Sequence, residues 1–191
     1  MKSKILLLFF LLFLTACVHK EGLLISKEKS FELGIAPFEG DFPSKFLSSL
    51  DQILNQELLK RGWVGFKDFT VVRQCEEIVL SKNPSLRGLD RWCEIGRCVP
   101  VRYLLIPELK RWRERKGSKW GVIEPCMVEF FFYLIDVKKK EVIKVFHFNK
   151  EQKSLSENIL EIKKFFKRKG WITAKELFTE GVIEGLKELG L

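Results

Sequence analysis

Histidine is scarce in this sequence of 191 residues, which contains only His19 and His147. The sequence also has no P-loop, no GxGxxG or HExxH motif and no GxSxG nucleophile elbow. These motifs build phosphate-binding loops, dinucleotide sites, zinc proteases and serine hydrolases, and their absence excludes the most recognisable form of each. We therefore expect no catalytic residue, no cofactor and no metal. Internal repeats and low-complexity segments are absent as well.

Long apolar runs are also missing, because the longest uninterrupted one covers only residues 5–14. A helix of that length spans about 15 Å, which is half of the hydrocarbon core of a bilayer. Lys2 and Lys4 precede the run. A basic start followed by a short apolar stretch is typical of a secretory signal peptide. We expect residues 1–16 to be such a peptide.

The residues after the run, Leu14-Thr15-Ala16-Cys17, resemble the lipobox of bacterial lipoproteins. The resemblance implies cleavage before Cys17, a diacylglyceryl group on its thiol and a further acyl chain such as palmitate. Two or more chains anchor a protein stably, at about 0.8 kcal/mol per buried methylene. Residues 17–30 then form a lipidated tether. Val18 stands where an aspartate would favour inner-membrane retention, so we expect an outer-membrane anchor facing the periplasm, with inner-membrane retention as the alternative.

Charge and hydrophobicity describe a basic, folded domain. Apolar residues make up 46% of the sequence and charged residues 31%, so a core can be buried beneath a polar surface. The formal net charge is +9, and about +7 remains after loss of Lys2 and Lys4. Such a charge favours contact with lipid head groups, cell-wall polymers or nucleic acid. Export to the envelope argues against nucleic acid as a partner.

Four cysteines remain once Cys17 carries lipid, and three interpretations of them are open. An even number in an oxidising compartment permits two disulfides. Free buried thiols are the second interpretation. A zinc site is the third, although the sequence contains no CxxC pair. The candidates for disulfide bonds are Cys75, Cys93, Cys98 and Cys126.

Apolar periodicity predicts a succession of strands and helices from residue 31 onward. Aromatic and β-branched residues make 126–136 the clearest strand, and Thr173 with Glu176 predicts a capping box before the last helix. The predicted strands cover 31–37, 70–73, 101–113, 126–136 and 141–148, and the predicted helices lie around 46–58, 75–81, 86–95, 155–168 and 173–189. We expect one periplasmic α/β domain, residues 31–191, with a mixed four- to five-stranded sheet packed with helices.

The strand predicted at 141–148 is apolar on both faces. Phe146 and Phe148 alternate with Val145 and His147, and Val142 precedes Ile143. Such a strand suits a sheet that is covered on both sides, or one that packs on helices with one face and on a partner with the other.

The strand and turn patterns resemble those of envelope lipoproteins. The matching segments are Ile35-Ala36-Pro37-Phe38, Thr70-Val71-Val72, Leu134-Ile135-Asp136-Val137 and Glu141-Val142-Ile143. They are similar to the amino-terminal domain shared by curli-secretion-type lipoproteins, lipoproteins that activate penicillin-binding proteins, and TolB-like proteins. The turn Lys138-Lys139-Lys140 departs from the Asp/Thr-Gly turn usual in that domain. The resemblance implies an adaptor or assembly role and no enzymatic one.

A basic and aromatic segment between the third and fourth predicted strands is the best candidate for a binding surface. It comprises Arg111, Trp112, Arg113, Arg115, Lys116, Lys119 and Trp120. Tryptophan favours membrane interfaces, and each basic residue adds about 1 kcal/mol of attraction to an anionic surface. The alternative is a solvated hairpin whose tryptophans pack on the core.

We expect a membrane-anchored, non-catalytic adaptor or assembly component that binds another envelope protein or itself. The alternatives are a cell-wall-acting enzyme with an unrecognised site and a carrier of lipid or polysaccharide. His147 and Asp136 with a serine would be the residue types of a catalytic triad, but no GxSxG elbow supports one and a structural histidine is favoured. A deep pocket with titratable groups of perturbed pKa favours the enzyme, and a closed apolar cavity favours the carrier. An exposed apolar strand edge favours the adaptor.

Overall fold

The computed structural model describes residues 32–117, 122–152 and 172–191. Its elements are β1 (Leu33–Ile35), α2 (Ser44–Lys60), α3 (Phe69–Lys82), α4 (Gly88–Cys98), β2 (Tyr103–Arg113), β3 (Lys116–Gly117), β4 (Val122–Glu124), β5 (Met127–Asp136), β6 (Glu141–Glu151) and α6 (Ala174–Leu189). The predicted signal peptide and tether, and the helix predicted around 155–168, lie outside the described residues. Within the described ranges, none of the helices has the length and apolar character needed to cross a bilayer.

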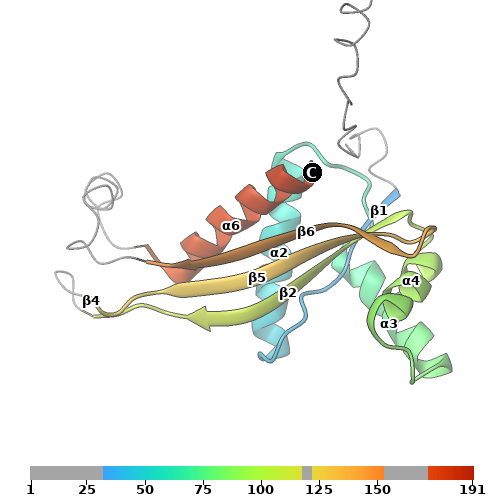
Figure 1. Ribbon diagram of the computed structural model, residues 1–191, viewed down its shortest axis with the longest axis horizontal. Helices are drawn as coiled ribbons and strands as arrows, with labels where there is room; N and C mark the ends of the chain where they lie inside the picture. Colours follow the sequence, from blue (N-terminus) through green and yellow to red (C-terminus); the bar gives the residue numbers. More distant parts are fainter. Residues whose placement is uncertain (1–31, 118–121, 153–171) are drawn as a thin grey trace, which may run out of the picture.

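Four strands form the main sheet in the order β1-β2-β5-β6 (Figure 1). β1 runs parallel to β2, whereas β2, β5 and β6 are antiparallel neighbours. The short strands β3 and β4 form a separate two-stranded sheet beyond the far end of β2 and β5. The predicted α/β class, with one mixed four-stranded sheet in one domain, is confirmed.

One face of the sheet packs on α2 and α6. Phenylalanines at alternate positions, Phe130 and Phe132 of β5 with Phe146 and Phe148 of β6, fill this interface and are buried. Helix α6 approaches the rings closely at Gly185, where any larger residue would place its Cβ 2.6 Å from the Phe146 ring. The alternation of aromatic residues along β5 and β6 therefore determines the face on which α6 lies.

The other face is covered at one end only, by α3 and α4 (Figure 1). Leu104 and Ile106 of β2 and Ile135 of β5 pack there in a second buried cluster with Trp92 and Ile95 of α4. Beyond α3 and α4, towards β3 and β4, this face of β5 and β6 has no helix over it among the described residues. The molecule is thus three layers thick at one end and two layers thick at the other.

The strand predicted at 70–73 is wrong, because these residues form the first turn of α3. Asp68 caps this helix, and its carboxylate accepts hydrogen bonds from the backbone N–H groups of Thr70 and Val71. Val72 and Cys75 are buried on one side, at helical spacing. A strong N-cap and a buried helical face together outweigh the β propensity of two adjacent valines.

The last helix follows the sequence prediction closely. The Thr173 side chain accepts a hydrogen bond from the Glu176 backbone N–H, and the Glu176 carboxylate accepts one from the Thr173 N–H, so the predicted capping box is confirmed. Gly190 ends α6 in the left-handed region, with φ of 82°, a conformation that glycine adopts at little cost.

Candidate functional site

The basic segment predicted to bind a surface lies where β2 leaves the main sheet. Its described arginine and lysine side chains meet carboxylates from neighbouring strands. Arg111 contacts Glu129 of β5, Arg113 contacts Glu151 of β6, and Lys116 lies 3.1 Å from Glu124. Arg115 is half-buried. Lys119 and Trp120 lie outside the described residues. These pairs reduce the positive field that the segment presents to an anionic surface.

Trp112 points to the opposite side of β2 from Arg111. Its ring meets the Phe46 ring edge-on, with centroids 5.0 Å apart, and lies 5.9 Å from the Phe178 ring. The indole N–H donates to Glu114 over 3.0 Å. Trp112 therefore packs against residues of α2 and α6.

The described residues as a whole are close to electrically neutral. They contain 22 Lys and Arg against 21 Asp and Glu, whereas the full sequence has 34 against 25. Most of the positive excess belongs to residues 1–31 and 153–171. The described domain surface thus gives little long-range attraction to anionic partners.

The uncovered part of the sheet carries a polar and aromatic strip, which we call the open strip. The strand register places its members side by side across β2, β5 and β6, with Phe131 opposite both Glu108 and His147. Val145 and His147, on the outermost strand, are about half exposed. The open strip comprises Glu108, Arg111, Glu129, Phe131, Tyr133, Val145 and His147.

Ring stacking and ion pairs order the open strip. The Phe131 and His147 rings are parallel with centroids 4.1 Å apart, and the Tyr133 ring also stacks with Phe131, with centroids 5.8 Å apart. His147 Nε2 lies 3.0 Å from Glu129 Oε1. The Arg111 guanidinium, helped by His147, holds the pKa of the Glu129 carboxyl below its usual range. The strip is therefore a set of mutually satisfied contacts on a rigid sheet.

This arrangement does not assemble the triad considered from the sequence. Asp136 lies five residues along β5 from the partner of His147, a distance of about 17 Å. Its carboxylate instead accepts a hydrogen bond from the Lys139 backbone N–H over 2.9 Å and faces Arg102. Among the described residues, the hydrogen bond of the His147 ring runs to Glu129, which is not a nucleophile for acyl transfer.

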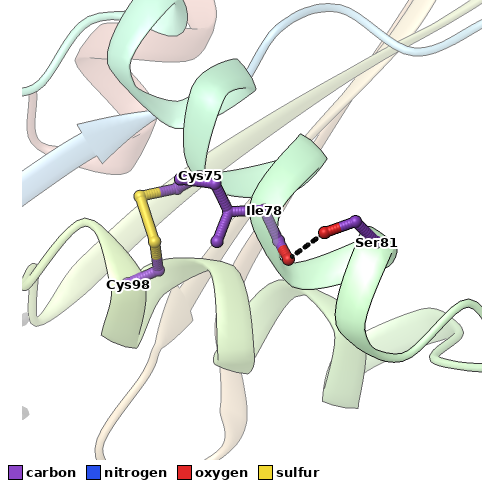
Figure 2. Close-up of a disulfide and its surroundings, with 4 residues drawn as sticks. All are labelled: Cys75, Ile78, Ser81 and Cys98. Atoms are coloured by element: carbon purple, nitrogen blue, oxygen red, sulfur yellow. Dashed lines mark hydrogen bonds between the residues drawn. A yellow bond between two sulfur atoms is a disulfide. The ribbon is translucent and has the colours of Figure 1, made fainter.

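A disulfide joins Cys75 of α3 to Cys98 at the end of α4, and Figure 2 shows it bridging the two helices. Cys93 and Cys126 are buried free thiols, so the four cysteines form one disulfide and not two. Burial raises the pKa of Cys126 to about 11, and it also raises the pKa of Cys93. No group of three or more His, Cys, Asp or Glu side chains in the described ranges is placed to hold a metal ion.

An open groove of about 570 Å³ runs beside the disulfide, between α3 and α4. Its apolar part consists of Ile78, Val79 and Leu86, and Lys82 and Arg97 stand at its rim with Glu94. The sequence prediction missed this groove, because it depends on how α3 packs beside α4, which apolar periodicity along each helix does not give. The groove is open to solvent and is unlike the closed apolar cavity expected of a carrier.

A buried carboxylate ties α2 to the chain after β1. Asp51 is 1% exposed and accepts a hydrogen bond from the Phe38 backbone N–H over 2.7 Å. Arg73 of α3 approaches its other oxygen at 3.4 Å. Burial raises the pKa of Asp51 to about 6, although the hydrogen bond and Arg73 both act in the opposite direction. Asp51 lies in the interior and is not part of the open strip.

No protein-family model and no curated protein matches the sequence. A point variant of PelC from Paraburkholderia phytofirmans, crystallised as a dodecamer, matches with a TM-score of 0.53 and 16% identity, over 88% of this chain and 93% of that chain. The C-terminal domain of LpoB from Escherichia coli matches with a TM-score of 0.39 and 15% identity, over 63% and 82%. Lipoprotein GNA1162 from Neisseria meningitidis matches with a TM-score of 0.40 and 10% identity, over 71% and 95%. The PelC comparison shows a common fold along nearly the whole of both chains.

Proposed function

We propose that this chain is a lipid-anchored protein of the bacterial envelope that acts without catalysis, as a component that assembles with copies of itself or with another envelope protein. The observation that carries the proposal is the fold shared with PelC, which forms a dodecamer. The match covers 88% of this chain, so the assembling protein and this one have the same architecture from β1 to α6.

The outer strand β6 supports assembly. It has 11 residues and lies at the edge of the sheet, with one side of its backbone unpaired among the described residues. Val142 and Val145 on this strand are 46% and 51% exposed. Long edge strands with exposed apolar side chains pair readily with other chains unless something covers them. A partner at β6 would cover both valines and the adjacent end of the open strip.

The proposal also includes a membrane anchor, which lies near the amino terminus of the chain. We infer acylation of Cys17 from the Leu14–Cys17 residues and an outer-membrane location from Val18 after it; all of these precede the described residues. The chain enters the domain at Leu33, which shares one end of the sheet with Asp136 and the β5–β6 turn. The segment around Arg113 and Lys116 lies at the opposite end, about 35 Å away along β2. We infer that the near end faces the membrane and that the edge of β6 stays open to a partner.

The test is the size and composition of the protein in its native envelope. Crosslinking of intact cells, followed by mild detergent extraction and light scattering, should capture a multimer or a defined complex. Val145→Glu should reduce the captured fraction by at least tenfold, since it places a charge on the exposed edge. Ile183→Glu is the matched control, because Ile183 is a similarly exposed apolar residue on α6. A monomer that captures nothing, and whose purified domain cleaves cell-wall fragments, would overturn the proposal.

A further inference from the structure

The native disulfide joins two cysteines that have a third, free cysteine between them in the sequence. Along the chain the order is Cys75, Cys93, Cys98, and the bond joins the first to the third, which are 23 residues apart. Cys93 lies between them, is fully buried and belongs to the same apolar cluster as Cys75. An oxidant that meets the unfolded chain therefore encounters a competing thiol between the two native partners.

Loop closure favours the competing thiol. Cys93 lies 18 residues after Cys75 and only five residues before Cys98. The probability that two residues of a flexible chain meet falls with about the 3/2 power of their separation. On that scaling Cys75 meets Cys93 about 1.4 times as often as it meets Cys98, and Cys93 meets Cys98 about tenfold more often than Cys75 does. Random oxidation thus forms bonds to Cys93 before the native bond.

The folded helices reverse this preference. Cys93 and Cys98 lie on α4, where five residues rise about 7.5 Å along the axis and turn about 140°. Two cysteines whose Cα atoms are more than about 7 Å apart cannot form a disulfide, so a Cys93–Cys98 bond prevents α4 from forming. The Cα atoms of Cys75 and Cys98 are 5.7 Å apart across the two helices. The structure accommodates the native bond and buries Cys93 as a free thiol.

We propose that oxidative folding of this chain passes through non-native disulfides of Cys93 and reaches the Cys75–Cys98 bond by thiol–disulfide exchange, a step that a thiol–disulfide isomerase accelerates. The proposal rests on the proposed export, which brings the chain into an oxidising compartment. Cys93 is a transient partner in this scheme. It is expelled from the disulfide as α3 and α4 pack together.

The exchange is balanced without a second oxidant. An oxidoreductase disulfide first accepts two electrons and two protons as Cys75 and Cys93 become joined. The Cys98 thiolate then attacks the Cys75 sulfur, so that the Cys75–Cys98 bond forms while the Cys75–Cys93 bond breaks. Cys93 leaves as a thiolate and takes up a proton. The equivalent route from a Cys93–Cys98 bond begins with attack of the Cys75 thiolate on the Cys98 sulfur.

Once the helices have packed, Cys93 is protected from further exchange. Its side chain is fully buried against residues of the second cluster, and exchange requires a thiolate that can reach a sulfur atom. Cys126 is equally buried but lies outside this cluster, at the start of β5, with its sulfur 3.5 Å from the Ile172 carbonyl oxygen. It therefore provides a matched control for the loss of a buried thiol.

The test follows oxidative refolding of the full mature lipoprotein in detergent micelles. The reduced, urea-unfolded protein is transferred to a glutathione redox buffer, quenched with N-ethylmaleimide and mapped by peptide mass spectrometry. Disulfides of Cys93 should dominate the first species. Cys93→Ala should form the Cys75–Cys98 bond faster than the wild type, because no disulfide of Cys93 has to be exchanged first, and added isomerase should bring no further acceleration. Cys126→Ala should keep the wild-type kinetics and the acceleration by isomerase.

Two results would overturn the inference. One is direct formation of the Cys75–Cys98 bond in the wild-type chain with no trapped disulfide of Cys93, a result that does not depend on whether any variant folds. The other is an unchanged wild-type rate when isomerase is added. Both results are obtained with the purified protein in vitro. The intact mass of the same sample reports acylation of Cys17 separately, so a failure of the proposed anchor is distinguishable from a failure of the exchange step.

Discussion

The buried carboxylate of Asp51 makes the stability of the fold depend on pH. In the folded protein its pKa is about 6, against 3.8 for the free side chain. Between these values the folded state binds more protons than the unfolded state, so the free energy of unfolding falls as pH rises. At 1.36 kcal/mol per pKa unit, the full loss is about 3 kcal/mol, of which about 2.4 kcal/mol falls between pH 4 and pH 7.

The substitution Asp51→Asn tests this dependence of stability on pH. Asparagine retains an oxygen that can accept from the Phe38 N–H, but it does not titrate. Urea denaturation followed by circular dichroism from pH 4 to pH 7.5 should show the wild type losing about 2.4 kcal/mol of unfolding free energy relative to the variant, mostly between pH 4 and pH 6. Asp90→Asn, at an exposed position, is the control for removing one carboxylate. If the free energy of unfolding changes with pH equally in the wild type and in Asp51→Asn, then Asp51 is not the source of the pH dependence.

Three further changes test the packing. Reduction of the Cys75–Cys98 bond, which closes a loop of 23 residues, should lower the free energy of unfolding by about 3.4 kcal/mol. Urea titration with and without a phosphine reductant measures this loss. A loss below about 1 kcal/mol would contradict the prediction. Gly185→Ala should destabilise by about 1–3 kcal/mol, because the new Cβ meets the Phe146 ring at 2.6 Å; a raised melting temperature would show that only helix propensity matters. Thr173→Ala should lower the free energy of unfolding by about 1 kcal/mol, because the helix loses its cap. Urea titration measures this loss, with Thr179→Ala as the control. Equal losses in the two variants would show that the cap does not stabilise α6.

Local patterns predicted most of the secondary structure. The strand at 126–136 and its neighbour at 141–148 are confirmed as β5 and β6, because aromatic residues alternate along both and bury one face. The helix at 173–189 is confirmed because its cap is encoded in four consecutive residues. The segment 70–73 was misassigned because its helical state depends on Asp68 before it and on Val72 being buried against α4 and the sheet.

The candidate site was much less predictable than the fold. Arg111 was chosen for its charge, yet its environment is set by Glu129, 18 residues away, and by a break in the β2–β5 register near Leu109. The stacking of His147 on Phe131 depends on the register of β5 and β6 in the same way. A shift of one residue would turn either side chain to the other face of the sheet. Cross-strand partners follow from register, which periodicity alone does not determine.

The disulfide pairing shows a similar limit. Four cysteines permitted two bonds, and only the packing of α3 on α4 selects Cys75 with Cys98 and buries Cys93 and Cys126. The order of the predicted strands and helices indicated the α/β architecture that the structure shows. Membership among curli-secretion-type, activator or TolB-like lipoproteins stays a prediction.

Native mass spectrometry of the lipoprotein released from its own envelope would report both the acylation of Cys17 and the assembly in one spectrum. We expect a subunit that begins at Cys17, carries the mass of a diacylglyceryl group with a further acyl chain, and occurs as a defined multimer or a defined complex with another envelope protein. A monomeric, unacylated chain that still begins at Met1 would contradict it.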